Sequence, residues 1–215
     1  MAKIGHTRMS RRDFQKLALV LPAPLALAVG WGRSAGIVVA QTETPTPVLA
    51  PTPACDDGDD LMVTLPQMAG PFFTPDSPER TSLLEPGLAG TPLVVAGFVY
   101  ATDCRPLAGA LLDFWQADDD GVYDNVGYRL RGHQFSDEDG RFTLETVVPG
   151  LYPGRTRHIH VNVQVADQPV LTTQLYFPDE PANETDGIFD PALIMDVEDV
   201  DEGQRAFFTF VLAGG

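Results

Sequence analysis

Lysine is missing from residues 41–215, and positive charge is scarce throughout that part of the chain. The whole sequence has 14 Lys and Arg against 30 Asp and Glu, but six of the basic residues and only one acidic residue lie within the first 40. The remainder therefore has 8 basic and 29 acidic residues, a formal charge of −21. A surface this negative repels phosphate backbones and anionic lipid headgroups, which argues against nucleic acid or a membrane surface as a partner.

The sequence also lacks an uninterrupted apolar run of membrane-spanning length. The best candidate follows the basic N-terminus, but it is short and is broken by Pro22 and Pro24. Before it stands "SRRDFQK", in which Arg11 and Arg12 resemble the paired arginines of a twin-arginine export signal. We therefore predict that residues 1–40 are removed after "VVA" and that the protein is exported, to a periplasmic, cell-envelope or secreted location without a membrane attachment. An ordinary secretory signal or a membrane anchor is the alternative.

Proline and threonine, then aspartate, dominate the next stretch, "QTETPTPVLAPTPACDDGDD". This composition is typical of an extended tether rather than a packed element, and we assign the tether to residues 41–59. Its acidic cluster lacks the spaced ligands of a calcium loop. Residues 60–215 then form one domain, which is long enough to bury a hydrophobic core.

Cysteine is limited to Cys55 and Cys104, and their spacing does not suit a zinc site. In an exported protein a single pair favours one disulfide, here between the end of the tether and the turn "ATDCRP". Such a bond would fasten the tether to the folded domain. Two unpaired thiols are the alternative.

Long periodic segments of the kind that form crossover helices are absent after residue 60. Instead, short runs rich in β-branched and aromatic residues alternate with turn-forming stretches such as "DDDG", "DEDG" and "DQP". The runs expected as strands are 93–101, 109–117, 141–147, 158–166, 171–177 and 205–213. Several short strands joined by turns predict an all-β fold, either an antiparallel sandwich or a barrel.

Histidine is scarce too, with four in the chain, yet two of them stand one residue apart in "RTRHIHVNV". The valines that follow them alternate with polar residues, which is typical of a strand. Because residues i and i+2 of a strand share a face, His158 and His160 are expected to project side by side. Paired imidazoles are a common start for a metal site, but the pair alone does not distinguish such a site from two surface or half-buried histidines.

Two tyrosines stand in unusual surroundings. Tyr123 follows the turn in "WQADDDGVY", and Tyr152 is flanked by proline and glycine in "VPGLYPGR", shortly before the histidine pair. A phenolate is a hard anionic oxygen donor, and Fe(III) is a hard acid that keeps a phenol ionised. Zinc more often takes Cys, three His, or His with a carboxylate, and non-haem Fe(II) oxygenases use two His and a carboxylate. Two imidazoles with two phenolates therefore favour Fe(III).

The stretches "DFWQADDDGVYDN", "RGHQFSDEDGRFTLETVVPGLYPGRTRHIHVNV" and "LTTQLYFPDE" resemble the intradiol ring-cleavage dioxygenases, the catechol and protocatechuate dioxygenase family. The similarity extends upstream to "AGPFFTP" and covers most of residues 60–215. The resemblance implies an Ig-like or transthyretin-like antiparallel β-sandwich with long loops. It also implies a non-haem Fe(III) site whose ligands fall on Tyr123, Tyr152, His158 and His160.

The resemblance assigns further residues around that site. Arg155, three residues before the first histidine of the pair, would lie beside the substrate and stabilise negative charge on its ring. Gln174 would lie near the iron, and Gly70, Pro71 and Phe72 would line the mouth of the pocket. The alternatives are a rim cation or ion pair for Arg155 and strand packing for Gln174. The helical N-terminal segment of catechol-type members has no counterpart here, so we expect an exported, single-domain type whose oligomeric state stays open.

The reaction implied by the resemblance is cleavage of a small aromatic diol by O2 between its two hydroxyl-bearing carbons, giving a muconate-type diacid. The iron would act as Lewis acid and template, and Tyr152 would leave the metal and accept a proton. Two other classes remain open: an iron-bearing relative that only binds catechols, and a metal-free secreted β-sandwich that binds a sugar or peptide. An exported enzyme is expected to act on aromatic compounds outside the cell.

Overall fold

The computed structural model describes residues 61–213. The predicted signal peptide and tether lie outside the described residues. Within the described part of the chain the regular structure is almost entirely β, and no helix there is long and apolar enough to cross a bilayer. The prediction of an all-β fold is confirmed.

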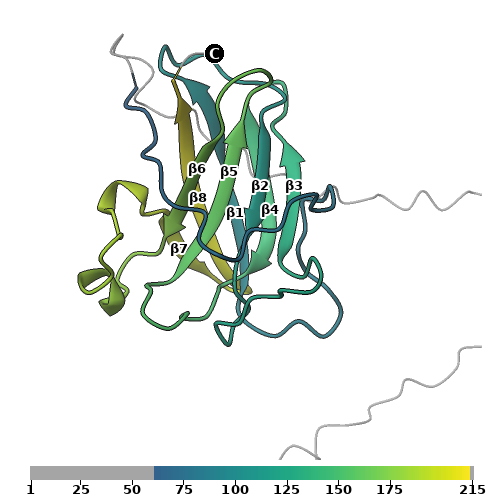
Figure 1. The fold of residues 1–215 in the computed structure, drawn as a ribbon, viewed down its shortest axis with the longest axis vertical. Helices are drawn as coiled ribbons and strands as arrows, with labels where there is room; N and C mark the ends of the chain where they lie inside the picture. The colour runs from purple at the N-terminus through teal and green to yellow at the C-terminus, as the bar shows by residue number, and fades with distance from the viewer. Residues whose placement is uncertain (1–60, 214–215) are drawn as a thin grey trace, which may run out of the picture. The chain divides into compact units, whose positions relative to one another are not determined.

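Two four-stranded sheets pack against each other as a sandwich (Figure 1). The first sheet has the order β4-β1-β8-β7, with bounds Arg141–Val147, Pro92–Ala101, Gly203–Leu212 and Asp196–Val200. The second has the order β3-β2-β5-β6, with bounds Arg131–Phe135, Leu111–Trp115, His158–Gln164 and Leu171–Tyr176. Two short 3-10 helices, η3 (Pro181–Glu184) and η4 (Pro191–Leu193), lie between β6 and β7. All of these strand pairs are antiparallel except β1 with β8, so the expected antiparallel sandwich contains one parallel pair.

Alternate side chains along β5 point to opposite faces of the second sheet, one set toward the core and the other toward the side of the two histidines. Ile159, Val161 and Val163 are fully buried in the main core between the sheets, whereas His158 and His160 point to the opposite face. The first sheet meets them with Leu93, Val95, Phe142, Leu144 and Phe210. The inner face of β5 makes the apolar contacts of this strand with the first sheet, so the outer face of β5 can carry polar side chains.

Two strands of the structure, β3 and β7, do not correspond to any predicted run. β3, "RGHQF", has no apolar alternation, because its outer face carries Arg131 and His133 beneath another segment. β7, "DVEDV", is an edge strand in which three of five residues are acidic and none is buried. Such sequences have low strand propensity, and their pairing depends on neighbours rather than on local pattern.

Residues 61–80 form what we call the strap, an extended segment that crosses the outer face of the second sheet from β6 to β3 (Figure 1). At the β6 end, the backbone N–H of Gln67 donates to the carbonyl of Thr172 at 2.7 Å. At the β3 end, the backbone N–H of Arg80 donates to the carbonyl of His133 at 2.8 Å. The strap therefore covers the face on which the two histidines of β5 lie.

The turn between β1 and β2 places Cys104 close to the start of the strap. Cys104 is half-buried with a φ of 62°. Two residues before it, the carbonyl of Thr102 accepts a hydrogen bond from the backbone N–H of Leu61 at 2.7 Å. Cys55 precedes Leu61 by six residues and lies outside the described residues, so the Cys55–Cys104 disulfide stays a prediction.

We expect Cys104→Ser to lower the free energy of unfolding of the mature exported protein by about 3–4 kcal/mol, because the bond closes a loop of about 50 residues in the unfolded chain. Urea unfolding with and without reductant measures this. Reductant should destabilise the wild type and leave Cys104→Ser unchanged. Alkylation of both thiols in the native protein before any reduction would show that the bond is absent.

Candidate metal centre

The outer face of the second sheet carries side chains that lie in register across its strands. Trp115 on β2 and Gln174 on β6 both pair with His160 on β5. The indole of Trp115 lies parallel to the His160 imidazole, with ring centroids 4.8 Å apart and an interplanar angle of 3°. His158 lies two residues away, and both histidines are buried, with exposures of 5% and 2%. The two imidazoles project side by side, as the strand period predicts.

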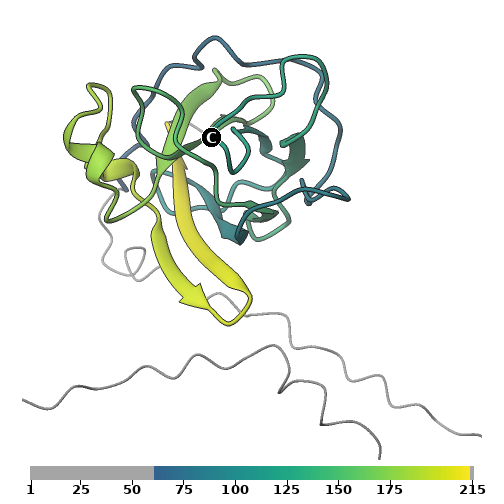
Figure 2. The ribbon, with the colours of Figure 1, turned by 90° about the horizontal axis from the view of Figure 1, so that it is seen from below.

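Two loops supply the tyrosines at the end of the sheet where β2 finishes and β5 begins. Tyr123 lies in the connection from β2 to β3, and Tyr152 lies in the connection from β4 to β5. This is the lower end of the sandwich in Figure 1, and Figure 2 looks onto it from below. Gly121 has a φ of +81°, and a Cβ there would lie 2.3 Å from the carbonyl oxygen of Leu151. Glycine is therefore required for the two loops to pack this closely.

The polar atoms of three predicted ligands converge, and the ring of the fourth lies beside them. The hydroxyl of Tyr123 lies 3.2 Å from Nε2 of His158, which in turn lies 3.1 Å from Nε2 of His160. The ring of Tyr152 packs edge-on against that of Tyr123, with centroids 5.9 Å apart. Nδ1 of His158 lies 2.6 Å from the carbonyl of Thr156, so we assign the ring proton to Nδ1 and a lone pair to Nε2. The structure thus brings all four predicted ligands to one place.

Burial sets the charge state of these groups. Desolvation lowers the pKa of His158 to about 4 and lowers the pKa of His160 well below its ordinary value. Both imidazoles are therefore neutral at pH 7, which is the form that binds a metal. Burial also raises the pKa of Tyr123 to about 12. A phenol in such a site ionises when a bound cation replaces the missing solvent.

The donor set fits Fe(III). Within residues 61–213, no group of three or more His, Cys, Asp and Glu side chains gathers in the way that a zinc or calcium site requires. The converging groups are instead two neutral imidazoles and two phenols. Two phenolates would offset two of the three charges of a ferric ion, and the imidazoles would complete a set of four ligands.

Arg155 lies beside the histidines and is held by two side chains. Its Nε forms an ion pair with Asp186 at 2.8 Å, and its Nη2 donates to Oε1 of Gln174 at 2.6 Å. Gln174 is the cross-strand neighbour of His160. Burial is the main cause of the low pKa values of His158 and His160, and the positive charge of Arg155 adds to it. The guanidinium is therefore close enough to act on charge at the site.

Gln174 is fully buried, and its amide is occupied by protein groups. Its Oε1 accepts from Arg155 and from the hydroxyl of Tyr176 at 3.1 Å, and its Nε2 donates to the carbonyl of Met68 at 2.8 Å. These bonds position Arg155 and the strap. Direct contact of Gln174 with a substrate stays a prediction.

The strap residues expected at the pocket mouth take different positions. A Cβ on Gly70 would lie 3.6 Å from Cε1 of His160, so the backbone passes directly over that ring. Phe72 stacks on Tyr123, with centroids 4.4 Å apart and an interplanar angle of 16°, and meets Tyr152 edge-on. Pro71, between them, is exposed. Gly70 and Phe72 therefore form part of the wall of the site.

Charged residues without any motif also shape the site. Asp186 accepts from Arg155 and from the backbone N–H of Thr156 at 2.9 Å. Asp124 follows Tyr123, and its carboxylate accepts three backbone N–H bonds, which lower its pKa to about 2. The partners of Asp124 lie two to five residues after it, so its turn is a local feature of the sequence. Arg155 and Thr156 precede Asp186 by 31 and 30 residues, so no local signal identifies that carboxylate.

The remaining histidine of the domain, His133 on β3, lies away from this cluster. Its Nδ1 lies 2.7 Å from the carbonyl of Ser77 and 3.2 Å from the hydroxyl of the same serine. Ser77 also donates to Asp113 at 2.7 Å. These contacts fasten the strap to β2 and β3, which agrees with a structural role for His133.

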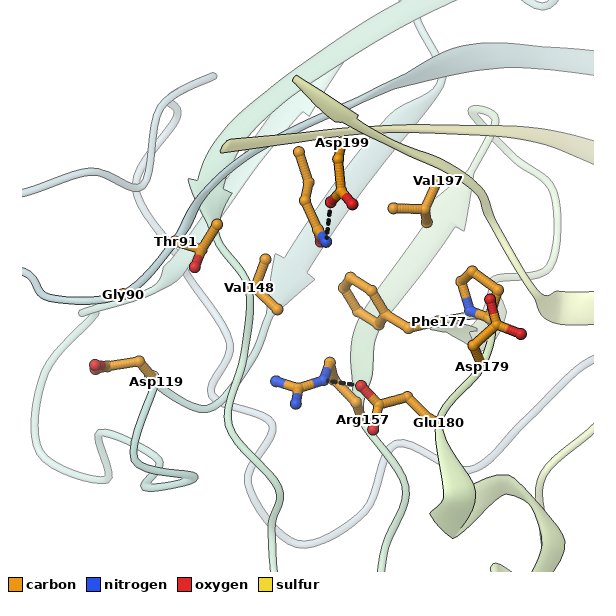
Figure 3. Close-up of a pocket in the computed structure, with 12 residues that line it drawn as sticks. Gly90, Thr91, Asp119, Val148, Arg157, Phe177, Asp179, Glu180, Val197 and Asp199 are labelled. Carbon is orange, nitrogen blue, oxygen red and sulfur yellow. Dashed lines mark hydrogen bonds and ion pairs between the residues drawn. The ribbon is translucent and has the colours of Figure 1, made fainter. Parts of the chain in front are cut away.

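A cavity of about 560 Å³ lies next to the loops that carry the tyrosines, and none of the predicted ligands lines it (Figure 3). Arg157, in its wall, pairs with Glu180 and donates to the carbonyl of Pro149 in the Tyr152 loop. Across the cavity, Nε2 of Gln204 donates to Asp199 at 2.9 Å. The wall of this cavity thus supports the Tyr152 loop without being part of the tyrosine and histidine cluster.

Several known sequences are similar to this chain. Residues 68–214 match the family described as Dioxygenase. The hydroxyquinol 1,2-dioxygenase of Rhizobium sp. (strain MTP-10005) is 31% identical over 166 residues, which are 64% of this chain and 56% of that protein. The 6-chlorohydroxyquinol 1,2-dioxygenase of Cupriavidus pinatubonensis is 32% identical over 178 residues, which are 69% and 64% of the two chains. The chain therefore spans less than two thirds of the length of either relative.

Solved structures show the same fold. The dioxygenase domain of a dioxygenase carbohydrate-binding protein fusion from the cellulolytic bacterium Streptomyces sp. SirexAA-E is 58% identical, with a TM-score of 0.70. The alignment covers 72% of this chain and 100% of that chain. The hydroxyquinol 1,2-dioxygenase from Pseudomonas putida DLL-E4 is 28% identical, with a TM-score of 0.64, over 71% of this chain and 67% of that one.

Proposed function

Since this chain belongs to the intradiol ring-cleavage dioxygenases, we propose that it cleaves catechol-type aromatic diols with O2 at a non-haem Fe(III) site. The observation that carries the proposal is the convergence of Tyr123, His158 and His160 within 3.2 Å contacts, with the ring of Tyr152 alongside. In the reaction, the bond between the two hydroxyl-bearing carbons breaks. Both atoms of O2 enter the product, a muconate-type diacid.

The two tyrosines have different surroundings, and this supports different roles for them. Ferric iron held by the four residues would supply Lewis acidity and a template for the two diol oxygens. Tyr123 is only 6% exposed and lies beneath Phe72, whereas Tyr152 is half-buried in a loop. We assign to Tyr152, as a phenolate, the acceptance of a proton from the diol, and to Tyr123 a permanent place among the ligands.

Arg155 would stabilise negative charge on the bound ring. Its guanidinium is fixed by Asp186 and Gln174 before substrate arrives, so little rearrangement is needed when charge develops. Trp115 stacks on His160, and Phe72 stacks on Tyr123. These two aromatic rings cover the sides of the site and keep water away from it. In such dry surroundings a nearby fixed charge acts more strongly than it would in solvent.

The substrate class we propose is that of small aromatic 1,2-diols. The similar proteins are named for hydroxyquinol, 6-chlorohydroxyquinol, catechol and chlorocatechol. All four are rings with adjacent hydroxyl groups, and they differ in further ring substituents. Two oxygens on neighbouring carbons are the shared feature that a ferric template would recognise.

The test begins with the absorption spectrum of the mature protein loaded with Fe(III). A tyrosinate-to-iron charge-transfer band, visible as a red-brown colour, is expected, together with uptake of one O2 per diol consumed and release of a diacid. A colourless protein that binds no Fe(III) would support a metal-free binding module instead. A coloured protein without O2 uptake would support a protein that only binds catechols.

We further propose that the protein acts outside the cytoplasm after export through its twin-arginine-type signal. Replacing both Arg11 and Arg12 with lysine should stop export and leave folded protein in the cytosol, because that pathway reads the arginine pair rather than positive charge alone. Cell fractionation and immunoblotting measure this. Arg33→Lys, in the same segment but outside the motif, is the matched control. Unchanged export of the double variant would contradict the proposal.

A further inference from the structure

Arg131, at the start of β3, is a buried cation with no carboxylate partner among the described ion pairs. Its exposure is 1%. The side chain donates to two main-chain carbonyls: Nη1 binds the oxygen of Phe72 at 2.6 Å, and Nε and Nη2 bind that of Asp124 at 3.1 and 2.7 Å. Burial of a guanidinium is unfavourable because its hydration is lost. An apolar residue of similar volume would avoid that cost. The hydrogen bonds of Arg131 must therefore be judged by the two segments that they fix to the sheet.

The first segment that Arg131 holds is the loop that carries Tyr123. The carbonyl of Asp124 is one peptide away from Tyr123. The carboxylate of the same Asp124 accepts from the backbone N–H groups of Val126 and Gly127, both at 2.9 Å, and of Arg129 at 3.0 Å. The loop is thus closed on itself by the Asp124 side chain and fixed to the sheet by Arg131 through the Asp124 backbone. The same loop carries the hydroxyl of Tyr123, which lies 3.2 Å from Nε2 of His158.

The second segment is the strap. Arg131 is the cross-strand neighbour of Trp115, so Arg131, Trp115, His160 and Gln174 form one row across all four strands of the sheet. The two ends of the row bind the strap, since Gln174 donates to the carbonyl of Met68 and Arg131 donates to the carbonyl of Phe72. Between these two hydrogen bonds, the backbone of Gly70 passes over the His160 ring.

We propose that Arg131 is a positioning residue of the metal site, which holds Tyr123 at its place among the ligands and holds the strap across His160. The inference rests on the proposed iron site and adds a residue that neither a motif nor a ligand contact identifies. Arginine is suited to this position because its planar fork reaches two carbonyls on different segments at once. A lysine ammonium can satisfy one carbonyl well but cannot reproduce the fork.

The experiment compares wild type, Arg131→Lys and Arg131→Met, using Ga(III) as a redox-inert substitute for Fe(III). We expect Arg131→Met to bind Ga(III) about 10–100-fold more weakly in a fluorescence titration of the apoprotein, as is usual when a partner outside the ligand shell is lost. With Fe(III), its charge-transfer band should weaken or shift, and kcat should fall more than KM changes. The Ga(III) affinity, band intensity and kcat of Arg131→Lys should lie between those of wild type and Arg131→Met.

Val95→Ala is the control for a general loss of stability. Val95 is fully buried in the first sheet and makes no part of the site, so its truncation should lower the melting temperature without altering the band or Ga(III) affinity. The proposal is overturned if the Arg131 variants keep the wild-type Ga(III) affinity and spectrum. It is also overturned if Val95→Ala, when destabilised to the same extent as an Arg131 variant, loses as much Ga(III) affinity as that variant does. If Arg131→Met does not fold, Arg131→Lys decides by the same criteria. Failure of the wild type itself to bind Fe(III) would instead refute the proposed function.

Discussion

Replacing Tyr123 by phenylalanine is expected to weaken the visible band, because Tyr152 remains as the single tyrosine ligand, and to lower kcat/KM by more than about a hundredfold. The change deletes a donor atom that lies 3.2 Å from Nε2 of His158, while it keeps the ring that stacks on Phe72. Loss of a group outside the ligand shell commonly costs about 10–100-fold in affinity or activity, and loss of a ligand should cost more. Absorption spectra, iron per chain and O2 uptake measure the effect.

Tyr128→Phe is the matched control for that experiment. Tyr128 lies in the same connection between β2 and β3, but its hydroxyl donates to the carbonyl of Pro75 at 3.0 Å and takes no part in the cluster. This variant should keep both colour and turnover. If Tyr123→Phe behaves in the same way as Tyr128→Phe, then the phenol of Tyr123 does not bind the metal.

Replacing Arg155 by methionine is expected to leave the iron and its band in place and to lower kcat on the order of a hundredfold. Arg155 is not among the converging ligands, so its loss should not remove the metal. What is lost is a fixed positive charge beside the reacting ring, and removal of one such group typically costs about a hundredfold or more. Iron content, spectrum and steady-state kinetics separate the two effects.

A complication of this substitution is that it leaves Asp186 without its cation. The Asp186 side chain is only 2% exposed, and an unpaired buried carboxylate destabilises a fold. The double variant Arg155→Met with Asp186→Asn removes the orphan charge and keeps one oxygen that can accept from the backbone of Thr156, although the bond from the backbone of Ile188 to the other oxygen is lost. Part of the lost stability should return in the double variant while kcat stays low. Recovery of kcat together with stability would show that Arg155 only supports the structure.

The parts of the site that the sequence predicts are those that depend on neighbouring residues. Strand alternation is a local property, so it is enough to place His158 and His160 on one face. The turns and the proline and glycine flanks of Tyr123 and Tyr152 likewise indicate loops without knowledge of the fold. The family pattern then joins these separate pieces of sequence into one expected site.

The parts that the sequence does not predict depend on segments far apart in the chain. The strand character of "RGHQF" comes from pairing with β2 and from cover by the strap, because its own residues lack apolar alternation. A buried arginine such as Arg131 resembles a surface arginine until the carbonyls of residues 72 and 124 are brought to it. Asp186 is similar, since its partner Arg155 lies 31 residues earlier.

The strap determines when the site can be completed during synthesis. It is the first described segment to leave the ribosome, yet the bond that holds Met68 comes from Gln174, 106 residues later. A nascent chain that ends between β5 and β6 therefore contains Tyr123, Tyr152 and the two histidines but has no closed cover over them. Contacts of such long sequence separation form late, because the entropy of closing the intervening chain must be overcome first. Closure of the strap over the histidines therefore requires the second sheet to be complete.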